Sequence, residues 1–427
     1  MHSSPTASDV VFEGQLLLPV GDGPRAPVSL AFGRVVVRGG VIEQVIVGEG
    51  GPRADVGGGD YFIAPGFVDA HVHLAQFGVI GATGMPLLEW LARMVFPAEA
   101  SWADEREAAA QAERAARSLL SFGTTAVAAY ATSHAPGATA ALHVLAELGM
   151  AGHVGQVLMD RGGPAELLVP AERALREAAG MRARGRVSPA VTPRFALSCS
   201  PELLAGAGRL AKATGWLVQT HVSETIEECE AVRELHDAPD YASVYDRAGL
   251  LGGRTLLAHG IHLSDDERRL IAGRGASIAH CPTANRFLRA GTFGRARALE
   301  AGVGVCLGSD VAGGPERSMV RVGRAMIEAA EAVADGQSRR PSDGPRVPTP
   351  AEAWWQITAG NAAVLGLEGC GQLRAGGDAD VVVCRPDAGW RDAPDPLSYL
   401  LYAWDDRWIE GVWAAGVRRH GGPVGGG

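Results

Sequence analysis

The chain has 427 residues, of which 47% are hydrophobic and 20% charged, a balance that predicts a globular protein with a sizeable buried core. The formal charge of −9 argues against sequence-independent nucleic-acid binding, and six scattered cysteines without a Cys-x-x-Cys pair indicate reduced thiols. With no apolar run long enough to span a bilayer and no signal peptide over Met1–Glu13, we expect a cytoplasmic protein that binds neither nucleic acid nor membrane.

Short β-rich runs at Val10–Leu18 and Val35–Val47 predict a small antiparallel sheet. Beyond them, apolar runs alternate with Ala-, Glu- and Arg-rich helical stretches such as Asp104–Leu120 and Ala138–Leu148. Eight such runs predict a closed parallel (β/α)8 TIM barrel; an open doubly wound sheet is the alternative, but no Gly-x-Gly-x-x-Gly follows the first run. The runs are Ala64–His73, Thr124–Tyr130, His153–Met159, Val187–Leu197, Trp216–Thr220, Thr255–Ala258, Ala276–Ala279 and Val303–Leu307.

The C-terminal part is predicted to return to short strands. A stretch rich in Pro, Ser, Gly and Arg at 337–350 predicts a surface loop, and Thr349–Leu365 predicts a helix. Short strands follow at Gly371–Leu373, Asp380–Val383 and Ile409–Val417.

We expect these last strands to join the N-terminal ones in one small domain. The predicted fold class is therefore α/β, with a (β/α)8 barrel at 65–367 inserted in a small composite β-sandwich domain formed by 1–64 plus 368–427. The glycine-rich end, 421–427, is expected to be frayed.

The first barrel strand carries a His-x-His pair. Side chains alternate across a strand, so His71 and His73 point the same way and can bind a single metal ion. The pair alone is a weak signal, because two histidines on a solvated strand edge would give the same pattern.

Residues of metal-ligand type recur where other predicted strands end. The C-terminal ends of the strands are where such barrels place their functional groups. Chance placement of 12 histidines would not favour such a ring, so we expect a site at this end of the barrel. The groups concerned are His71 with His73, His221 with Glu224, His259, His280 and Asp310.

Three neutral nitrogens and one carboxylate suit zinc or iron and leave a position for water. A metal held there would lower the pKa of that water from about 15.7 towards 7 and so supply a hydroxide nucleophile. Asp310 can also accept a proton from the water, and Glu224 is placed to carry protons. His259 either hydrogen-bonds the reacting groups or orients a ligand, whereas His280 is expected to be structural. The expected ligands are His71, His73, His221 and Asp310.

Several stretches resemble the amidohydrolase superfamily, specifically its mononuclear-metal deaminase branch and, within that branch, the guanine deaminases. The likeness covers nearly the whole chain, with departures at Phe77, Pro201 and Pro315–Arg317 that bear on fine substrate preference and leave the metal ligands unchanged. The stretches that carry the resemblance are Phe67–Gln76, Pro86–Leu91, Phe96–Glu99, Thr192–Ser200, His221–Glu224, Tyr241–Leu251 and Ser309–Gly314.

The resemblance implies hydrolytic deamination of guanine to xanthine and ammonia by a homodimer with one zinc ion per chain. It implies that Glu224 is the proton shuttle and that His259 and Asp310 also take part in catalysis. The implied contacts to the purine are Gln76, Arg194, Phe195, His221, Glu224 and Asp310.

Three other kinds of protein share part of this pattern. A deaminase of this branch could instead act on 8-oxoguanine, a pterin or an s-triazine. A non-catalytic scaffold of the superfamily typically loses metal ligands, whereas this chain keeps the full set. The smaller zinc deaminase fold needs His-x-Glu with Pro-Cys-x-x-Cys, and neither motif occurs.

Overall fold

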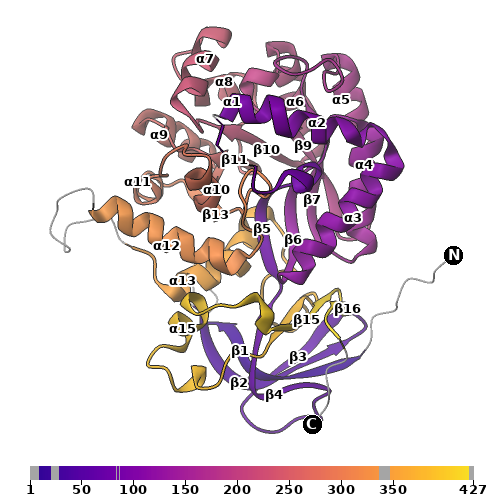
Figure 1. Ribbon diagram of the computed structural model, residues 1–427, viewed down its shortest axis with the longest axis vertical. Helices are drawn as coiled ribbons and strands as arrows, with labels where there is room; N and C mark the ends of the chain where they lie inside the picture. Colours follow the sequence, from indigo (N-terminus) through magenta and orange to yellow (C-terminus); the bar gives the residue numbers. More distant parts are fainter. Residues whose placement is uncertain (1–8, 21–27, 83, 86, 336–346, 423–427) are drawn as a thin grey trace.

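The computed structural model describes residues 9–20, 28–82, 84–85, 87–335 and 347–422. Figure 1 shows two parts, a barrel of parallel strands wrapped by helices and a separate β-sheet built from both ends of the chain. The predicted fold class is thus confirmed. The expectations for 337–346 and 423–427, and for Pro86, lie outside the described residues.

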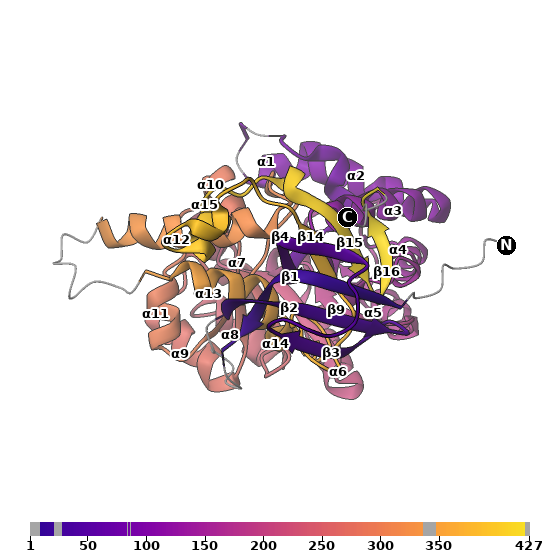
Figure 2. The same cartoon turned by 90° about the horizontal axis from the view of Figure 1, so that it is seen from below.

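The sheet from the two chain ends has seven strands in the order β16-β15-β14-β4-β1-β2-β3, and it lies across the base of the molecule in Figure 2. Phe12 on β1 and Trp413 on β15 pack edge to face with ring centroids 4.8 Å apart. In a flat sheet these strands would be about 14 Å apart, so the sheet curls around its own core. The strands are β1 (Val10–Pro19), β2 (Val28–Arg38), β3 (Val41–Val47), β4 (Val56–Pro65), β14 (Val381–Cys384), β15 (Ile409–Ala414) and β16 (Val417–His420).

Three features of the terminal segments differ from the sequence prediction. The run predicted over 35–47 is the end of β2 and the whole of β3, joined by a turn at Gly39 and Gly40. Strand β4 was not predicted because it contains the run Gly57-Gly58-Gly59, and glycine weakens any strand signal. Residues 371–373 form no strand in the structure.

All eight predicted barrel runs are strands, and all neighbouring pairs among them are parallel. The third run is split into β7 and a short β8 (Val157–Leu158) that pairs with the next strand. In order around the barrel the strands are β5 (Phe67–His73), β6 (Thr124–Tyr130), β7 (Ala151–Gly155), β9 (Val187–Pro193), β10 (Leu217–Val222), β11 (Thr255–His259), β12 (Ser277–His280) and β13 (Gly304–Leu307).

Helices cover the outside of the barrel (Figure 1). The helix predicted over Thr349–Leu365 consists of three consecutive segments, namely α13, a π-helical turn at Gln356–Gly360, and α14. Leu365 at the end of α14 is buried and packs with the small residues inside the barrel. The helices are α1 (Leu87–Trp90), α2 (Phe96–Ala100), α3 (Glu105–Ser121), α4 (Ala135–Glu147), α5 (Ala171–Gly180), α6 (Pro201–Thr214), α7 (Ile226–His236), α8 (Tyr241–Arg247), α9 (Asp265–Arg274), α10 (Pro282–Phe287), α11 (Arg295–Glu300), α12 (Met319–Asp335), α13 (Pro350–Trp355), α14 (Asn361–Leu365) and α15 (Pro396–Tyr402).

The barrel closes between its first strand, β5, and its last, β13. Asn361 at the start of α14 bridges them, since its amide donates to the carbonyls of Val68 and Leu307 at 2.7 Å each and accepts from the Leu307 N–H at 2.9 Å. Gly308 permits the approach, because a Cβ there would lie 2.5 Å from that of His71. We call this contact between β5 and the end of β13 the seam.

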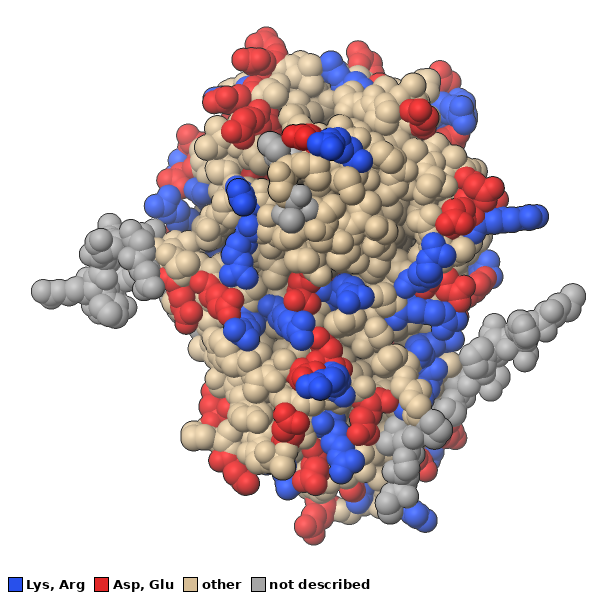
Figure 3. Space-filling view, viewed as in Figure 1, with Lys and Arg blue, Asp and Glu red and all other residues tan. Residues whose placement is uncertain are grey.

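The surface carries charges of both signs. Figure 3 shows basic and acidic side chains intermingled around the edge and over the lower half of the viewed face, whereas the upper half includes a broad area without charged side chains. Among the described residues, no helix combines the length and the apolar character that crossing a bilayer requires.

We expect Asn361→Leu to lower the free energy of unfolding by about 3 kcal/mol, because three buried backbone groups of the seam lose their partner. Denaturant unfolding followed by fluorescence measures the change. Arg176→Gln, which breaks the exposed pair with Glu172, is the control and should cost less than about 0.5 kcal/mol. Equal losses in the two variants would contradict a special role for the seam.

Candidate active site

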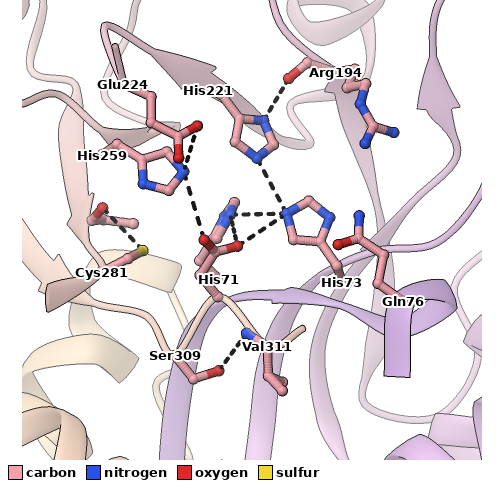
Figure 4. Close-up of polar contacts among 12 residues, drawn as sticks. His71, His73, Gln76, Arg194, His221, Glu224, His259, Cys281, Ser309 and Val311 are labelled. Atoms are coloured by element: carbon pink, nitrogen blue, oxygen red, sulfur yellow. Dashed lines mark hydrogen bonds and ion pairs between the residues drawn. The ribbon is translucent and has the colours of Figure 1, made fainter. Parts of the chain in front are cut away.

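Four ligand atoms converge at the C-terminal end of the barrel (Figure 4). Nε2 of His73 lies 3.2 Å from Nε2 of His71 and 3.2 Å from Nε2 of His221. Oδ1 of Asp310 lies 3.2 Å from His71 Nε2 and 3.3 Å from His73 Nε2. Neighbouring ligands of a tetrahedral zinc ion are about 3.3 Å apart, so these donors fit a divalent metal ion of that size.

The imidazoles are held in the neutral form that a metal requires. Burial lowers the pKa of His71, lowers that of His73 to about 4, and lowers that of His221 well below its usual range. His221 Nδ1 lies 2.6 Å from the carbonyl oxygen of Arg194, a contact that places a proton on Nδ1 and leaves the Nε2 lone pair available. The ring of Tyr130 packs against all three histidines, with centroids 4.7 to 4.9 Å away.

Backbone hydrogen bonds across the seam hold Asp310 beside His71 and His73. Its N–H donates to the carbonyl of His71 at 2.8 Å, and the N–H of His73 donates to the carbonyl of Val311 at 2.7 Å. The buried carboxyl group of Asp69 on β5 accepts from the Ser309 N–H at 2.9 Å, which ties down the residue before Asp310. Asp310 itself has a left-handed backbone with φ of 54°, an unfavourable conformation for a residue with a Cβ that the surrounding contacts maintain.

Glu224 and His259 lie beside the ligand cluster. Nε2 of His259 is 3.6 Å from Glu224 Oε2 and 3.9 Å from Asp310 Oδ2. Burial, together with the charges of Asp310 and Glu228, raises the pKa of Glu224 well above its usual range. A carboxyl group in this position can therefore hold a proton at neutral pH and release it to a partner.

A cavity opens next to the ligand cluster. Gln76, Arg194 and Phe195, which the sequence singled out, all line it. Trp90 at the end of α1 and Leu91 directly after it form an apolar wall of the cavity. The other lining residues are His73, Leu87, His221, Glu224, His259, Leu288, Asp310 and Gly313.

Two buried residues at the site had no role in the sequence analysis. Asn285 on α10 lies with Oδ1 2.9 Å from Nδ1 of His259, so it fixes the orientation of that ring. Glu99 at the end of α2 contacts both Gln76 and Arg194. Glu99 lies in Phe96–Glu99, a stretch that carries the family resemblance, but a sequence does not show which side chains an acidic residue contacts.

Other histidines lie apart from the ligand cluster. His280 is buried at the end of β12, and its ring packs on Phe293 with centroids 5.0 Å apart. His153, His236 and His262 each contact a backbone carbonyl oxygen at 2.9 Å, as structural histidines do.

Comparison with known proteins relates the chain to the amidohydrolase family. The model of the amidohydrolase family matches residues 62–419. The chain is 34% identical over 380 residues to the guanine deaminase of Homo sapiens, covering 83% of this chain and 82% of that protein.

Two crystal structures share the fold and are likewise named guanine deaminases. The protein from Bradyrhizobium japonicum is 29% identical with a TM-score of 0.89, over 97% of this chain and 100% of that one. The protein from C. acetobutylicum, solved with guanine bound in its active site, is 29% identical with a TM-score of 0.87, over 96% and 100% of the two chains.

We expect the protein to retain a divalent metal ion between pH 7 and pH 5. Burial lowers the pKa of His73 to about 4, so the ring stays neutral in a range where an ordinary histidine, with a pKa of about 6.5, takes up a proton. Elemental analysis after dialysis at each pH measures the metal. His73→Ala should lose it, whereas His280→Ala, a buried histidine outside the cluster, should keep it; release with a midpoint near pH 6.5 would contradict the expectation.

Proposed function

The chain belongs to the amidohydrolase family, and from that premise we propose that it hydrolyses guanine to xanthine and ammonia. The observation that carries the proposal is the cavity beside the ligand cluster. Around this one space the structure brings together the four ligands, a carboxyl group with a raised pKa, a cationic side chain and an apolar wall. Guanine is a flat base with an amino group on C2 and two acceptors, O6 and N7, on its far edge.

We propose that the ligand cluster holds one zinc ion. The donor set supports this, because imidazole nitrogens and carboxylate oxygens are both zinc ligands, and a water molecule would complete the site as a fifth ligand. Such an ion supplies a nucleophile at neutral pH by lowering the pKa of a water molecule from about 15.7 to about 7. The residues that would hold it are His71, His73, His221 and Asp310.

The protein's own groups move the protons. Glu224 takes a proton from the attacking water and delivers it to the ring nitrogen beside C2, then carries the second proton to the amino nitrogen, which leaves as ammonia. The raised pKa of Glu224 supports this role, because the protonated form is accessible between the two transfers. His259, 3.6 Å from Glu224 and oriented by Asn285, hydrogen-bonds the reacting groups, and Asp310 accepts the second proton of the water before Glu224 carries it to the amino nitrogen.

The far end of the cavity holds the base. Arg194 offers N–H donors to the acceptors O6 and N7, and Gln76 provides an amide beside it. Phe195 packs on the face of the ring system. The base also lies against His221, Glu224 and Asp310, which line the same cavity.

We propose further that the enzyme is a cytoplasmic homodimer. All six cysteines are free thiols and five of them are buried, as in proteins of a reducing compartment. The dimer follows from the family resemblance alone, and sedimentation of the purified protein tests it.

Glu224→Gln should lower kcat for guanine about 1000-fold while the bound metal stays at the wild-type level, because the amide keeps the shape of the side chain but cannot carry a proton. Ammonia release and elemental analysis provide the two readouts. Glu227→Gln, at an exposed position on α7, is the matched control and should leave kcat unchanged. Persistence of wild-type turnover in Glu224→Gln would show that another group moves the protons.

Guanine should be deaminated at least tenfold more efficiently, as kcat/KM, than 8-oxoguanine, a pterin or an aminated s-triazine. The reason is that the cavity places fixed polar groups against one edge of the base, and a misplaced partner there costs about 1–3 kcal/mol. Ammonia release across the four compounds provides the ranking. A higher kcat/KM for another compound would show that this compound, and not guanine, is the substrate. A protein that turns over none of the four compounds and binds no metal would favour a non-catalytic scaffold.

A further inference from the structure

A buried carboxylate lies behind the two polar side chains that face the base. Oε1 of Glu99 accepts from Nε2 of Gln76 at 2.8 Å, and Oε2 of Glu99 accepts from Nη1 of Arg194 at 2.6 Å. Glu99 is 1% exposed, Gln76 2% and Arg194 4%, so water does not compete for these bonds. Charge-assisted hydrogen bonds in such a site are among the strongest in a protein.

This contact decides which way the amide of Gln76 faces. An ionised carboxylate only accepts hydrogen bonds, so the amide nitrogen of Gln76 must turn towards Glu99 and the amide oxygen away from it. That oxygen is buried and has no hydrogen-bond partner among the described residues. Figure 4 shows it on the side of His73, and both residues line the cavity.

The same carboxylate fixes Arg194. One oxygen of Glu99 binds Nη1, and the guanidinium also lies over the ring of Phe96 at 5.3 Å from its centroid. Arginine has donors only, so the groups that it turns towards the cavity donate. The wall therefore presents an acceptor at Gln76 next to donors at Arg194.

We propose that Glu99 is a positioning residue that sets base specificity by fixing this acceptor–donor pattern. The inference rests on the proposed function for the identity of the base. Guanine presents N1–H, O6 and N7 along one edge, a donor followed by two acceptors, which the pattern complements. Adenine presents a bare N1 and a 6-amino group there, which reverses the first two positions and leaves buried polar groups unpaired.

Binding of two bases that lack the 2-amino group tests the pattern apart from the chemistry. Hypoxanthine has the edge of guanine, and adenine has the reversed one. Isothermal titration of the zinc-loaded protein should give a dissociation constant for hypoxanthine at least about 30-fold below that for adenine. In Glu99→Gln, whose amide lets Gln76 turn over, the ratio should fall to within about threefold.

A second variant guards against a folding defect, since Glu99→Gln leaves a buried arginine without its carboxylate. Gln76→Met keeps the Arg194–Glu99 pair and removes only the acceptor, so it should lower the preference for hypoxanthine about tenfold with zinc content unchanged. Glu89→Gln is the control. Glu89 lies on α1 and forms an exposed ion pair with Arg93, so this variant should keep the wild-type ratio.

The outcomes separate this inference from the proposed function. A wild-type ratio retained in folded Glu99→Gln and Gln76→Met would overturn the inference, as would a wild-type ratio near one in a protein that deaminates guanine. A protein that binds hypoxanthine selectively, loses the selectivity in both variants and yet leaves guanine intact would support the inference and overturn the proposed function.

Discussion

The seam between β5 and the end of β13 is the contact on which the site depends. The two strands are more than 200 residues apart in the chain, and the backbone bonds at the seam bring Asp310 beside His71 and His73. Asn361 closes the lower part of the seam and Asp69 fixes the residue before Asp310. A shift of either strand by one residue would turn the alternating side chains to the other face and take a ligand away from the cluster. The same contacts therefore close the barrel and bring the metal-ligand side chains together.

Burial acts on the two kinds of titratable group in opposite directions, and the site uses both effects. It lowers the pKa of the imidazoles, which keeps His73 and His221 neutral, and it raises the pKa of Glu224, which lets a carboxyl group hold a proton. Neither effect needs a special residue type. One dry environment produces a set of lone pairs for a cation and a proton carrier next to it, and the low dielectric strengthens every contact between them.

Periodicity and strand-end residues were enough to predict the barrel and the groups at its rim. The eight apolar runs are all strands, and His71, His73, His221 and Asp310 lie together because parallel strands end at the same edge. The sequence did not predict β4, whose glycines obscure the strand pattern, or the partners of Glu99 and Asn285. These last depend on side-chain contacts between segments far apart in the chain, which periodicity does not encode. The domain boundaries, the roles of the site residues and the dimer stay predictions.

The terminal sheet sets the order in which the molecule can be completed during translation. Strands β1 to β4 emerge from the ribosome first, but the edge of β4 has no partner until β14 is made at Val381–Cys384. Asn361 also arrives late, so the nascent chain carries an open strand edge and an open barrel for most of its synthesis. Unpaired edges invite pairing with other chains, so the incomplete polypeptide is exposed to such pairing until Asn361 and β14 have been made.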